Sequence, residues 1–237
     1  MESITRKRKS RKQLHRKRRR RKLIRLALIG ILIFLILITV FLAFFAVRHF
    51  YQTLFDKVDI VLDAGHGGKD PGANVDDVIE KNITLEIAQM TQEILENAGY
   101  KVGMTRTDDT FVELTERPVF ANQKKADVFV SIHCNSSEDG IGNGIETFYT
   151  EQKGKSSETL ANEIQNALIE HTNAENREVK TANYTVLVRT NMPTALVEVG
   201  FLTDSAEKEL LQTEEYQKKL AEGIAEGIIR WKDNLTL

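Results

Sequence analysis

The sequence predicts an α/β fold: a mostly parallel, twisted sheet flanked by helices and preceded by one transmembrane helix. Three observations lead to this prediction. From about residue 57 to the end of the 237-residue chain, short β-rich runs alternate with amphipathic helical segments, as in parallel sheets covered by helices. Turns rich in Gly and Asp separate these runs. Before them, residues 26–47 form one unbroken apolar stretch.

The apolar stretch has 22 residues without a charge or a proline. As a helix it spans roughly 33 Å, about the thickness of a bilayer core. A buried core helix is seldom apolar on all sides over such a length. A signal peptide usually has an apolar stretch of about 7–15 residues and a small-residue cleavage site, and the end of this stretch offers no clean site. We therefore favour an uncleaved signal-anchor helix; cleavage, which would give a secreted protein, is the alternative.

Charge divides the chain sharply. Residues 1–25 hold 14 of the 33 Lys and Arg, whereas residues 51–237 hold 18 Lys and Arg against 33 Asp and Glu, a net charge of −15. The positive-inside rule makes residues 1–25 a basic cytoplasmic tail, which we expect to be disordered and to suit anionic lipid headgroups. Residues 48–56 are then a stalk, and residues 57–237 an exported domain. Its acidic charge argues against nucleic acid as a partner.

The domain is predicted to open with a strand at 58–62 that ends in a turn rich in Gly, Asp and Pro. Apolar residues at 83, 87, 90, 94 and 98 keep helical spacing, and Gly99 ends that helix. A helix at 112–125 is interrupted or kinked at Pro118. The other predicted elements are strands at 100–105, 128–133, 144–149, 185–188 and 195–199, and helices at 156–171, 205–211 and 214–232.

Four residues far apart in the chain look like parts of one site. His66, His133 and Glu198 lie at or just after predicted strand ends, and Glu80 lies at the start of a predicted helix. In open α/β sheets, active groups gather beyond the carboxyl ends of the strands. Two imidazoles and a carboxylate can hold Zn²⁺ and leave its fourth position for water, and a second carboxylate can move protons for that water. If the four residues converge, the chain is a hydrolase.

Each of these residues also has a structural explanation. His66 fits a plain turn, His133 a hydrogen-bonded core histidine, and Glu80 a solvated acid in the first turn of a helix. Glu198 is harder to explain in this way, because apolar residues flank it and an ionised buried Glu is costly unless paired or bound. Burial would raise its pKa toward the range useful for proton transfer, and a buried pair with Arg or Lys is the alternative.

Other polar residues are weaker candidates. Asp63 is a candidate hydrogen-bond partner of a ligand histidine. Arg106 and Arg117 are either structural or substrate-binding, and Arg189 is expected at the surface. Cys134 is the single cysteine, so no intrachain disulfide can form, and we expect it to be a small buried core residue. An exported domain of this size without disulfides fits a bacterial envelope.

Taken together, these segments resemble the zinc-dependent N-acetylmuramoyl-L-alanine amidases of the amidase-3 type. The resemblance covers residues 58 to about 232, and its pieces occur in the family's order. They are Leu62-Asp63-Ala64-Gly65-His66-Gly67-Gly68-Lys69-Asp70-Pro71-Gly72-Ala73, Glu80-Lys81, Arg106-Thr107-Asp108, Leu114-Thr115-Glu116-Arg117, Ala126-Asp127-Val128-Phe129-Val130-Ser131-Ile132-His133, and Ala195-Leu196-Val197-Glu198-Val199-Gly200-Phe201-Leu202.

The resemblance implies that His66, Glu80 and His133 bind Zn²⁺ and that Glu198 is the catalytic general acid and base. The implied reaction is hydrolysis of the amide between N-acetylmuramic acid and L-alanine in peptidoglycan. The implied setting is the outer face of a bacterial cytoplasmic membrane, with a protein activator as a possible further partner. Two departures stand out: Cys134 replaces a frequent Ala, and residues 135–144 are too short for the inserted helix that blocks some relatives' active sites.

Two other functions remain as alternatives at this stage. One is a different zinc hydrolase on the same scaffold, such as a peptidase or a deacetylase, which the products of the reaction would distinguish. The other is a tethered wall-binding or division-scaffold module without activity. Such a module would have no need for an acid embedded in the apolar segment 195–199.

Overall fold

The structure is a computed structural model that describes residues 2–55, 57–137, 140 and 142–234. The chain divides into two units, Met1–Asp56 and Lys57–Leu237.

The first unit is one long helix, α1 (Glu2–Phe55). Among the described residues, its segment Arg19–Arg48 is the one helix long and apolar enough to cross a membrane. The basic tail was expected to be disordered, but its described residues 2–25 are helical in this structure, and so is most of the expected stalk. Lys, Arg, Leu and Ile are good to fair helix formers, and residues 2–55 contain no proline and only one glycine, Gly30.

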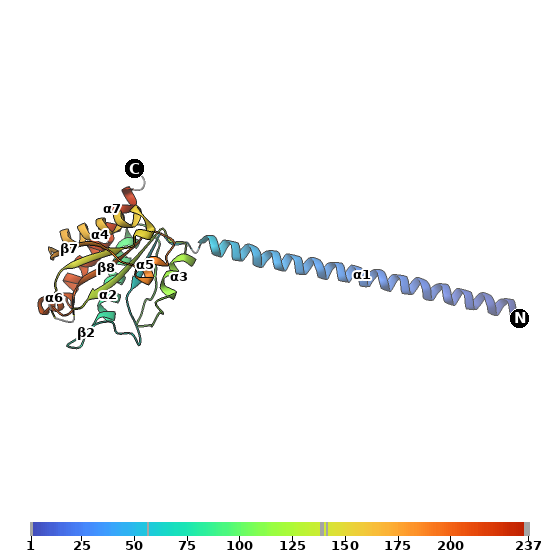
Figure 1. The fold of residues 1–237 in the computed structure, drawn as a ribbon. Coiled ribbons are helices and arrows are strands. Elements are labelled where there is room, and N and C mark those ends of the chain that lie inside the picture. Colours follow the sequence, from blue (N-terminus) through green and yellow to red (C-terminus); the bar gives the residue numbers. More distant parts are fainter. Residues whose placement is uncertain (1, 56, 138–139, 141, 235–237) are drawn as a thin grey trace. The chain divides into compact units, whose positions relative to one another are not determined.

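The second unit is built on a six-stranded sheet with the strand order β4-β1-β5-β8-β6-β7 (Figure 1). The first four strands in this order are parallel, whereas β6 runs antiparallel to β8 and parallel to β7. This arrangement confirms the predicted mostly parallel sheet. The strands are β1 (Ile60–Ala64), β4 (Val102–Met104), β5 (Val128–Asn135), β6 (Ile145–Tyr149), β7 (Asn176–Thr181) and β8 (Thr194–Phe201), and a separate hairpin joins β2 (Asn74–Val75) to β3 (Val78–Ile79).

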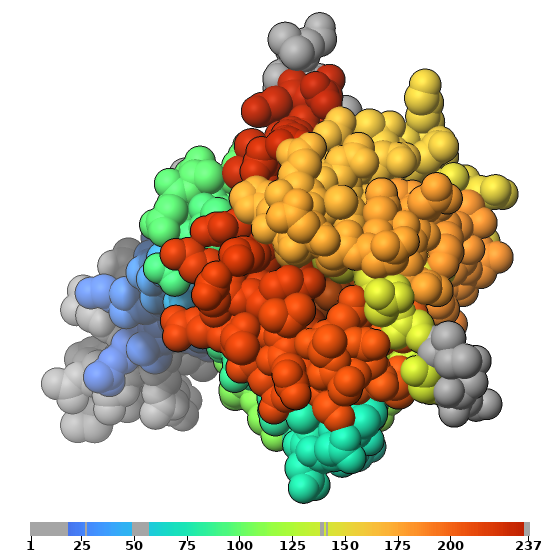
Figure 2. Space-filling model, turned by 90° about the vertical axis from the view of Figure 1, so that its left-hand side faces the viewer, coloured from blue at the N-terminus to red at the C-terminus, as the bar shows by residue number. Residues whose placement is uncertain are grey.

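Helices cover the two faces of the sheet unequally. One face packs against the long helices α2 (Glu80–Asn97), α4 (Lys155–Thr172) and α7 (Glu214–Asn234), which enclose the larger apolar core. Figure 2 shows α7, in red, beside α4, in gold, on this side of the molecule. The opposite face carries a smaller core against α3 (Glu116–Gln123) and α5 (Thr185–Val188). The remaining helices are η1 (Glu151–Lys153) and α6 (Ser205–Leu211).

The central strands are buried along their whole length, which explains their continuous apolar runs. In β1 and β8 nearly every residue is buried, as expected for a parallel sheet covered on both faces. Because parallel strands end at the same edge, β1, β5 and β8 deliver the residues at their carboxyl ends to one place. The predicted convergence of distant residues therefore follows from the order of the strands.

One predicted element was wrong, and one observed strand was not predicted. Residues 185–188 were expected to form a strand, but they form the single helical turn α5, in which Val186 and Leu187 pack into the smaller core. The edge strand β7 was not predicted, because its sequence Asn-Arg-Glu-Val-Lys-Thr is polar and four of its six residues are exposed. Both errors arise from short segments, where tertiary packing outweighs local propensity.

Candidate metal centre and active site

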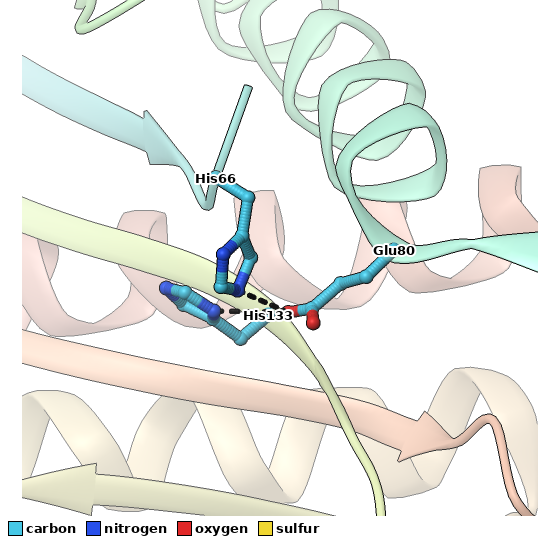
Figure 3. Close-up of side chains that lie close together, drawn as sticks. All are labelled: His66, Glu80 and His133. Carbon is cyan, nitrogen blue, oxygen red and sulfur yellow. Dashed lines mark hydrogen bonds and ion pairs between the residues drawn. The ribbon is translucent and has the colours of Figure 1, made fainter. Parts of the chain in front are cut away.

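Three of the predicted residues meet at the carboxyl-terminal edge of the sheet. His66 lies two residues beyond the end of β1, His133 lies near the end of β5, and Glu80 is the first residue of α2. Figure 3 shows both imidazoles directed at the Glu80 carboxylate. Its Oε1 atom lies 3.0 Å from His66 Nε2 and 3.0 Å from His133 Nδ1. One ligand atom from each residue falls within 4.8 Å of the others, so the three can hold one metal ion.

The backbone around His66 is shaped for this cluster. His66 has a φ of 60°, in the left-handed region that a non-glycine residue seldom adopts. Its neighbour Gly65 leaves room for the other imidazole, because a Cβ atom there would lie 2.5 Å from the His133 ring. A Cβ atom at Gly72 would lie 2.4 Å from Glu80 Oε2. The glycines of the predicted turn thus make space for the ligand side chains.

Two buried arginines hold this loop in place. Arg117 donates hydrogen bonds to the backbone oxygens of Ala64 and His66, at 2.8 and 2.7 Å. Arg106 donates to the oxygens of Ala64 and Gly65, at 2.9 and 2.8 Å. Both guanidinium groups therefore have a structural role, the first of the two predicted for them. Arg117 also lines the pocket in front of the cluster, so contact with substrate remains open to it.

A further carboxylate, Asp70, acts on His66 and was missed in the sequence. Its Oδ2 atom lies 3.0 Å from His66 Nδ1, while Nε2 of the same ring faces Glu80. A carboxylate on one ring nitrogen fixes the tautomer that leaves the other nitrogen free to bind a metal. The signal in the sequence was an acid four residues after the histidine within one tight turn.

Glu80 is surrounded by hydrogen-bond donors. Besides the two imidazoles, its carboxylate accepts the backbone N–H groups of Ala73, at 2.8 Å, and Cys134, at 3.0 Å. Burial alone would raise the pKa of Glu80, but its hydrogen bonds to His133 and His66 hold that pKa well below its usual range. Glu80 therefore stays ionised, as a metal ligand must.

Glu198 lies beside the cluster in a contrasting environment. It is paired in register with His133 across β5 and β8. Its Oε2 atom is buried and, within the described part of the chain, has no hydrogen-bond partner. Burial raises the pKa of Glu198 to about 7, and the negative charges of Glu80 and Glu146 add to the effect while His133 opposes it. A carboxyl group with such a pKa can both accept and release a proton near neutral pH.

Glu146 is a second buried acid that sequence reasoning missed. It lies opposite Glu198 in the antiparallel pair of β6 and β8 and is 5% exposed. Its carboxylate accepts hydrogen bonds from Asn135 Nδ2 at 2.7 Å, Arg177 Nε at 2.9 Å, and Lys180 Nζ. Burial would raise its pKa, but Lys180 and Arg177 lower it below the usual range. Glu146 is thus ionised, while its neighbour Glu198 is poised between two protonation states.

A pocket of about 240 Å³ opens in front of the metal cluster. Its polar wall includes His66, His133 and Arg117, and its apolar wall comes from the segment 111–114 and from Val186. The ammonium group of Lys69 lies over the Phe111 ring, 4.1 Å from the ring centroid. The pocket therefore opens onto the two histidines of the cluster.

The structure also places three other residues that were considered in the sequence: Asp63, Cys134 and Arg189. Asp63 was a candidate partner of a ligand histidine, but its hydrogen bonds go to Thr105, Ser131 and Arg117, so it supports the His66 loop through Arg117. Cys134 is buried as expected, and burial raises the pKa of its thiol well above the usual value. Arg189 is exposed, also as expected.

The fold and the cluster define a class of protein: an α/β domain with a histidine–carboxylate cluster that can hold a metal ion at the carboxyl ends of parallel strands. Residues 60–230 match the family model of the N-acetylmuramoyl-L-alanine amidases of the amidase-3 type. The chain therefore belongs to this family of peptidoglycan-hydrolysing enzymes.

Individual relatives agree with this assignment. A sporulation-specific N-acetylmuramoyl-L-alanine amidase of Bacillus subtilis is 38% identical over 173 residues, which cover 72% of this chain and 67% of that protein. YqiI of Bacillus subtilis, an uncharacterised protein, is 37% identical over 175 residues, covering 73% and 84%. The crystal structure of an N-acetylmuramoyl-L-alanine amidase from Clostridium difficile 630 matches with a TM-score of 0.73 and 36% identity, covering 75% and 98%. The family and activity predicted from the sequence are thereby confirmed.

Proposed function

We propose that His66, Glu80 and His133 hold a catalytic Zn²⁺ and that Glu198 is the general acid and base of the amidase. The donor set carries this proposal: two imidazole nitrogens and one carboxylate oxygen lie within 4.8 Å of one another. This ligand set is typical of catalytic zinc sites, which keep a further position for water. When bound there, zinc supplies a Lewis acid and lowers the pKa of its water.

The residues around the cluster support this chemistry. Asp70 holds His66 in one tautomer, and the hydrogen bonds to Glu80 keep that carboxylate ionised. Glu198 takes the proton from the attacking water as the new C–O bond forms. It then gives that proton to the amide nitrogen as the C–N bond to L-alanine breaks, so the proton count balances. Its pKa of about 7 suits both steps.

We infer that the helical segment Arg19–Arg48 anchors the protein in the cytoplasmic membrane and that the catalytic unit is extracytoplasmic. The basic residues on the amino-terminal side of the segment support this orientation. A cleaved signal sequence would export the same domain. Sequencing the amino terminus of the mature protein distinguishes the two: an intact terminus in the membrane fraction supports the anchor, and a terminus beyond residue 47 overturns it.

The test of the activity uses the full-length protein in detergent with purified peptidoglycan. The products are separated and identified by mass spectrometry. We expect stem peptides with a free L-alanine amino terminus and intact glycan chains, lost with a chelator and restored by Zn²⁺. Peptides cut at another bond would indicate a peptidase. A zinc-loaded Glu198→Gln variant that is as active as the wild type would exclude the role given to Glu198.

A further inference from the structure

Two cations lie on the side of Glu198 that is away from the metal cluster. The strand order places His133 on β5, Glu198 on the adjacent β8, Glu146 on the next strand β6, and Arg177 and Lys180 on the edge strand β7. Register pairs His133 with Glu198 and Glu198 with Glu146, so these side chains share one face of the sheet. Metal ligand, proton carrier and cations therefore follow one another across the sheet.

The two cations are held at this place by Glu146. Arg177 and Lys180 both donate to Glu146 Oε2, and the Arg177 guanidinium lies 4.8 Å from the centroid of the Phe201 ring. One cation suffices to neutralise one carboxylate, so the three groups together carry a single positive charge in excess. The Arg177 side chain is 34% exposed and that of Lys180 is 42% exposed, so part of each side chain is accessible to a ligand.

The surface around the cations is hollowed. A depression of about 460 Å³ is lined by Asn143, Glu175, Asn176, Arg177, Glu178 and Lys180. Glu175 and Glu178 are exposed and line the same depression, so with the buried Glu146 three acids face two cations, and the outer acids weaken the attraction for an anion. Replacing an outer acid is therefore a way to strengthen the binding of an anionic ligand.

The spacing suits a peptide that leads away from the scissile amide. Neighbouring strands lie about 4.8 Å apart, so Glu146 on β6 is roughly 10 Å from the strand of His133. Two extended residues span about 7 Å. The span of two peptide residues falls about 3 Å short of β6, and the side chains of the second peptide residue and of Arg177 and Lys180, which point toward Glu146, cover the remaining distance. The apolar pocket by segment 111–114 lies instead beside His66 and His133.

We propose that Arg177 and Lys180 form a subsite for a carboxylate of the stem peptide, close to the second residue after the scissile amide. The proposal rests on the amidase function proposed above. The peptide then runs from the metal cluster over β8 and β6 toward β7, and the enzyme prefers a stem peptide with a free carboxylate at this residue over one with a carboxamide.

Binding tests the subsite without catalysis. Two synthetic peptides begin with L-alanine and differ only in whether the second residue carries a free carboxylate or its amide. Calorimetry with the zinc-loaded, full-length protein in detergent at low salt should show roughly tenfold tighter binding of the acid form, because a charge-assisted pair is lost with the amide. Added salt should reduce this preference. Equal binding of both peptides by the wild type would overturn the proposal.

Variants test whether Lys180 is responsible for the preference for the peptide with the free carboxylate. Lys180→Gln leaves Glu146 with Arg177 and Asn135 and should reduce the preference to about twofold. Lys155→Gln, at an exposed lysine at the start of α4, makes the same charge change elsewhere and should leave the preference intact. Glu178→Gln should tighten the binding of the acid peptide. An unchanged preference in Lys180→Gln would place the preference elsewhere and contradict the proposal.

Kinetics separate this proposal from the amidase function itself. With muramoyl forms of the two peptides, Lys180→Gln should raise the KM of the acid substrate more than that of the amide substrate, with little change in kcat, because the contact is present before and during the reaction. If neither substrate were cleaved but the acid peptide bound preferentially, the amidase function would fail and the subsite would stand. If both were cleaved with equal KM, the amidase would stand and the subsite would fail.

Discussion

Glu80 and Glu198 are two glutamates that both neighbour His133, and their surroundings differ: Glu80 is hydrogen-bonded to the His133 ring, whereas Glu198 is paired in register with His133 across β5 and β8. The Glu80 carboxylate receives two imidazoles and two backbone N–H groups. Glu198 has one buried oxygen that no described residue contacts by a hydrogen bond. The pKa of Glu80 lies below the usual range of a glutamate, whereas that of Glu198 is raised to about 7.

The comparison teaches that the environment, and not the residue type, assigns the two roles. A carboxylate kept charged by donors suits a metal ligand, and one that is desolvated and left without donors suits a proton carrier. Pairs of acids whose environments separate their pKa values in this way mark acid and base assignments in enzymes. Substitutions at these two glutamates and at their neighbours test whether the roles of metal ligand and proton carrier are separate.

The largest effect is expected from Glu80→Gln. The neutral amide cannot replace the charged ligand, so zinc affinity and activity should both fall. A loss of several kcal/mol of metal-derived stabilisation corresponds to about a 10⁴-fold lower kcat/KM. Metal content by mass spectrometry and product release from peptidoglycan measure the two quantities. Glu93→Gln, at an exposed position of the same helix, is the matched control and should retain both. Full zinc content in Glu80→Gln would contradict the assignment.

Glu198→Gln should lower kcat by about 10³-fold, within the range for loss of a general acid–base group. Zinc binding should persist, because the three ligands remain. The contrast between retained metal and lost turnover separates this variant from Glu80→Gln. Metal titration and single-turnover kinetics on the same preparation measure both. Loss of zinc together with activity would mean that Glu198 is itself a ligand.

Asp70→Asn should weaken zinc binding by about 10- to 100-fold, because the hydrogen bond that orients a metal-binding histidine is altered. Competition with a chromogenic chelator measures the affinity. Asp77→Asn, in the exposed turn between β2 and β3, makes the same substitution on the same segment and serves as the control. Equal affinities for the two variants would show that His66 needs no support from Asp70.

The smallest expected effect is a pH dependence. Glu198 must be ionised to accept a proton, so kcat/KM should fall by about tenfold per pH unit once the pH drops below its pKa, which burial raises to about 7 in the metal-free protein. The positive charge of bound zinc shifts this limb to lower pH. Glu80, whose pKa is lowered, stays ionised and causes no change in kcat/KM near neutral pH. The limb should be absent from the residual activity of Glu198→Gln, and its persistence there would assign it to another group.

The sequence predicted the central part of the molecule well. Continuous apolar runs mark β1, β5 and β8, and these strands carry or precede His66, His133 and Glu198. The placement of Glu80 was predicted less directly, since an acid in the first turn of a helix is common. Its proximity to both histidines depends on the β2–β3 hairpin, which turns the chain back before α2 and which was not predicted from the sequence.

The peripheral part was harder to predict. Asp70 and Glu146 gave no distinctive pattern, because a polar residue in a turn and an acid in a strand near the sheet edge are both ordinary. Their roles arise from partners such as His66 and Lys180, which only the folded chain brings close. The helix at 185–188 was missed for a related reason: four residues give too little periodicity to separate a turn of helix from a strand.

The sharing of one Glu80 oxygen by two imidazoles has a further consequence for how the centre is loaded. Burial opposes protonation of both rings, but the contact with Glu80 prevails and raises the pKa of His66 and of His133. Protons and a metal ion therefore compete for the same place, and uptake of the metal is an ion exchange in which protons leave as the cation enters. Lowering the pH therefore removes the metal ion from such a centre, as a chelator does, and raising the pH favours its return. The fraction of enzyme molecules that hold a metal ion would then depend on the pH of the surroundings.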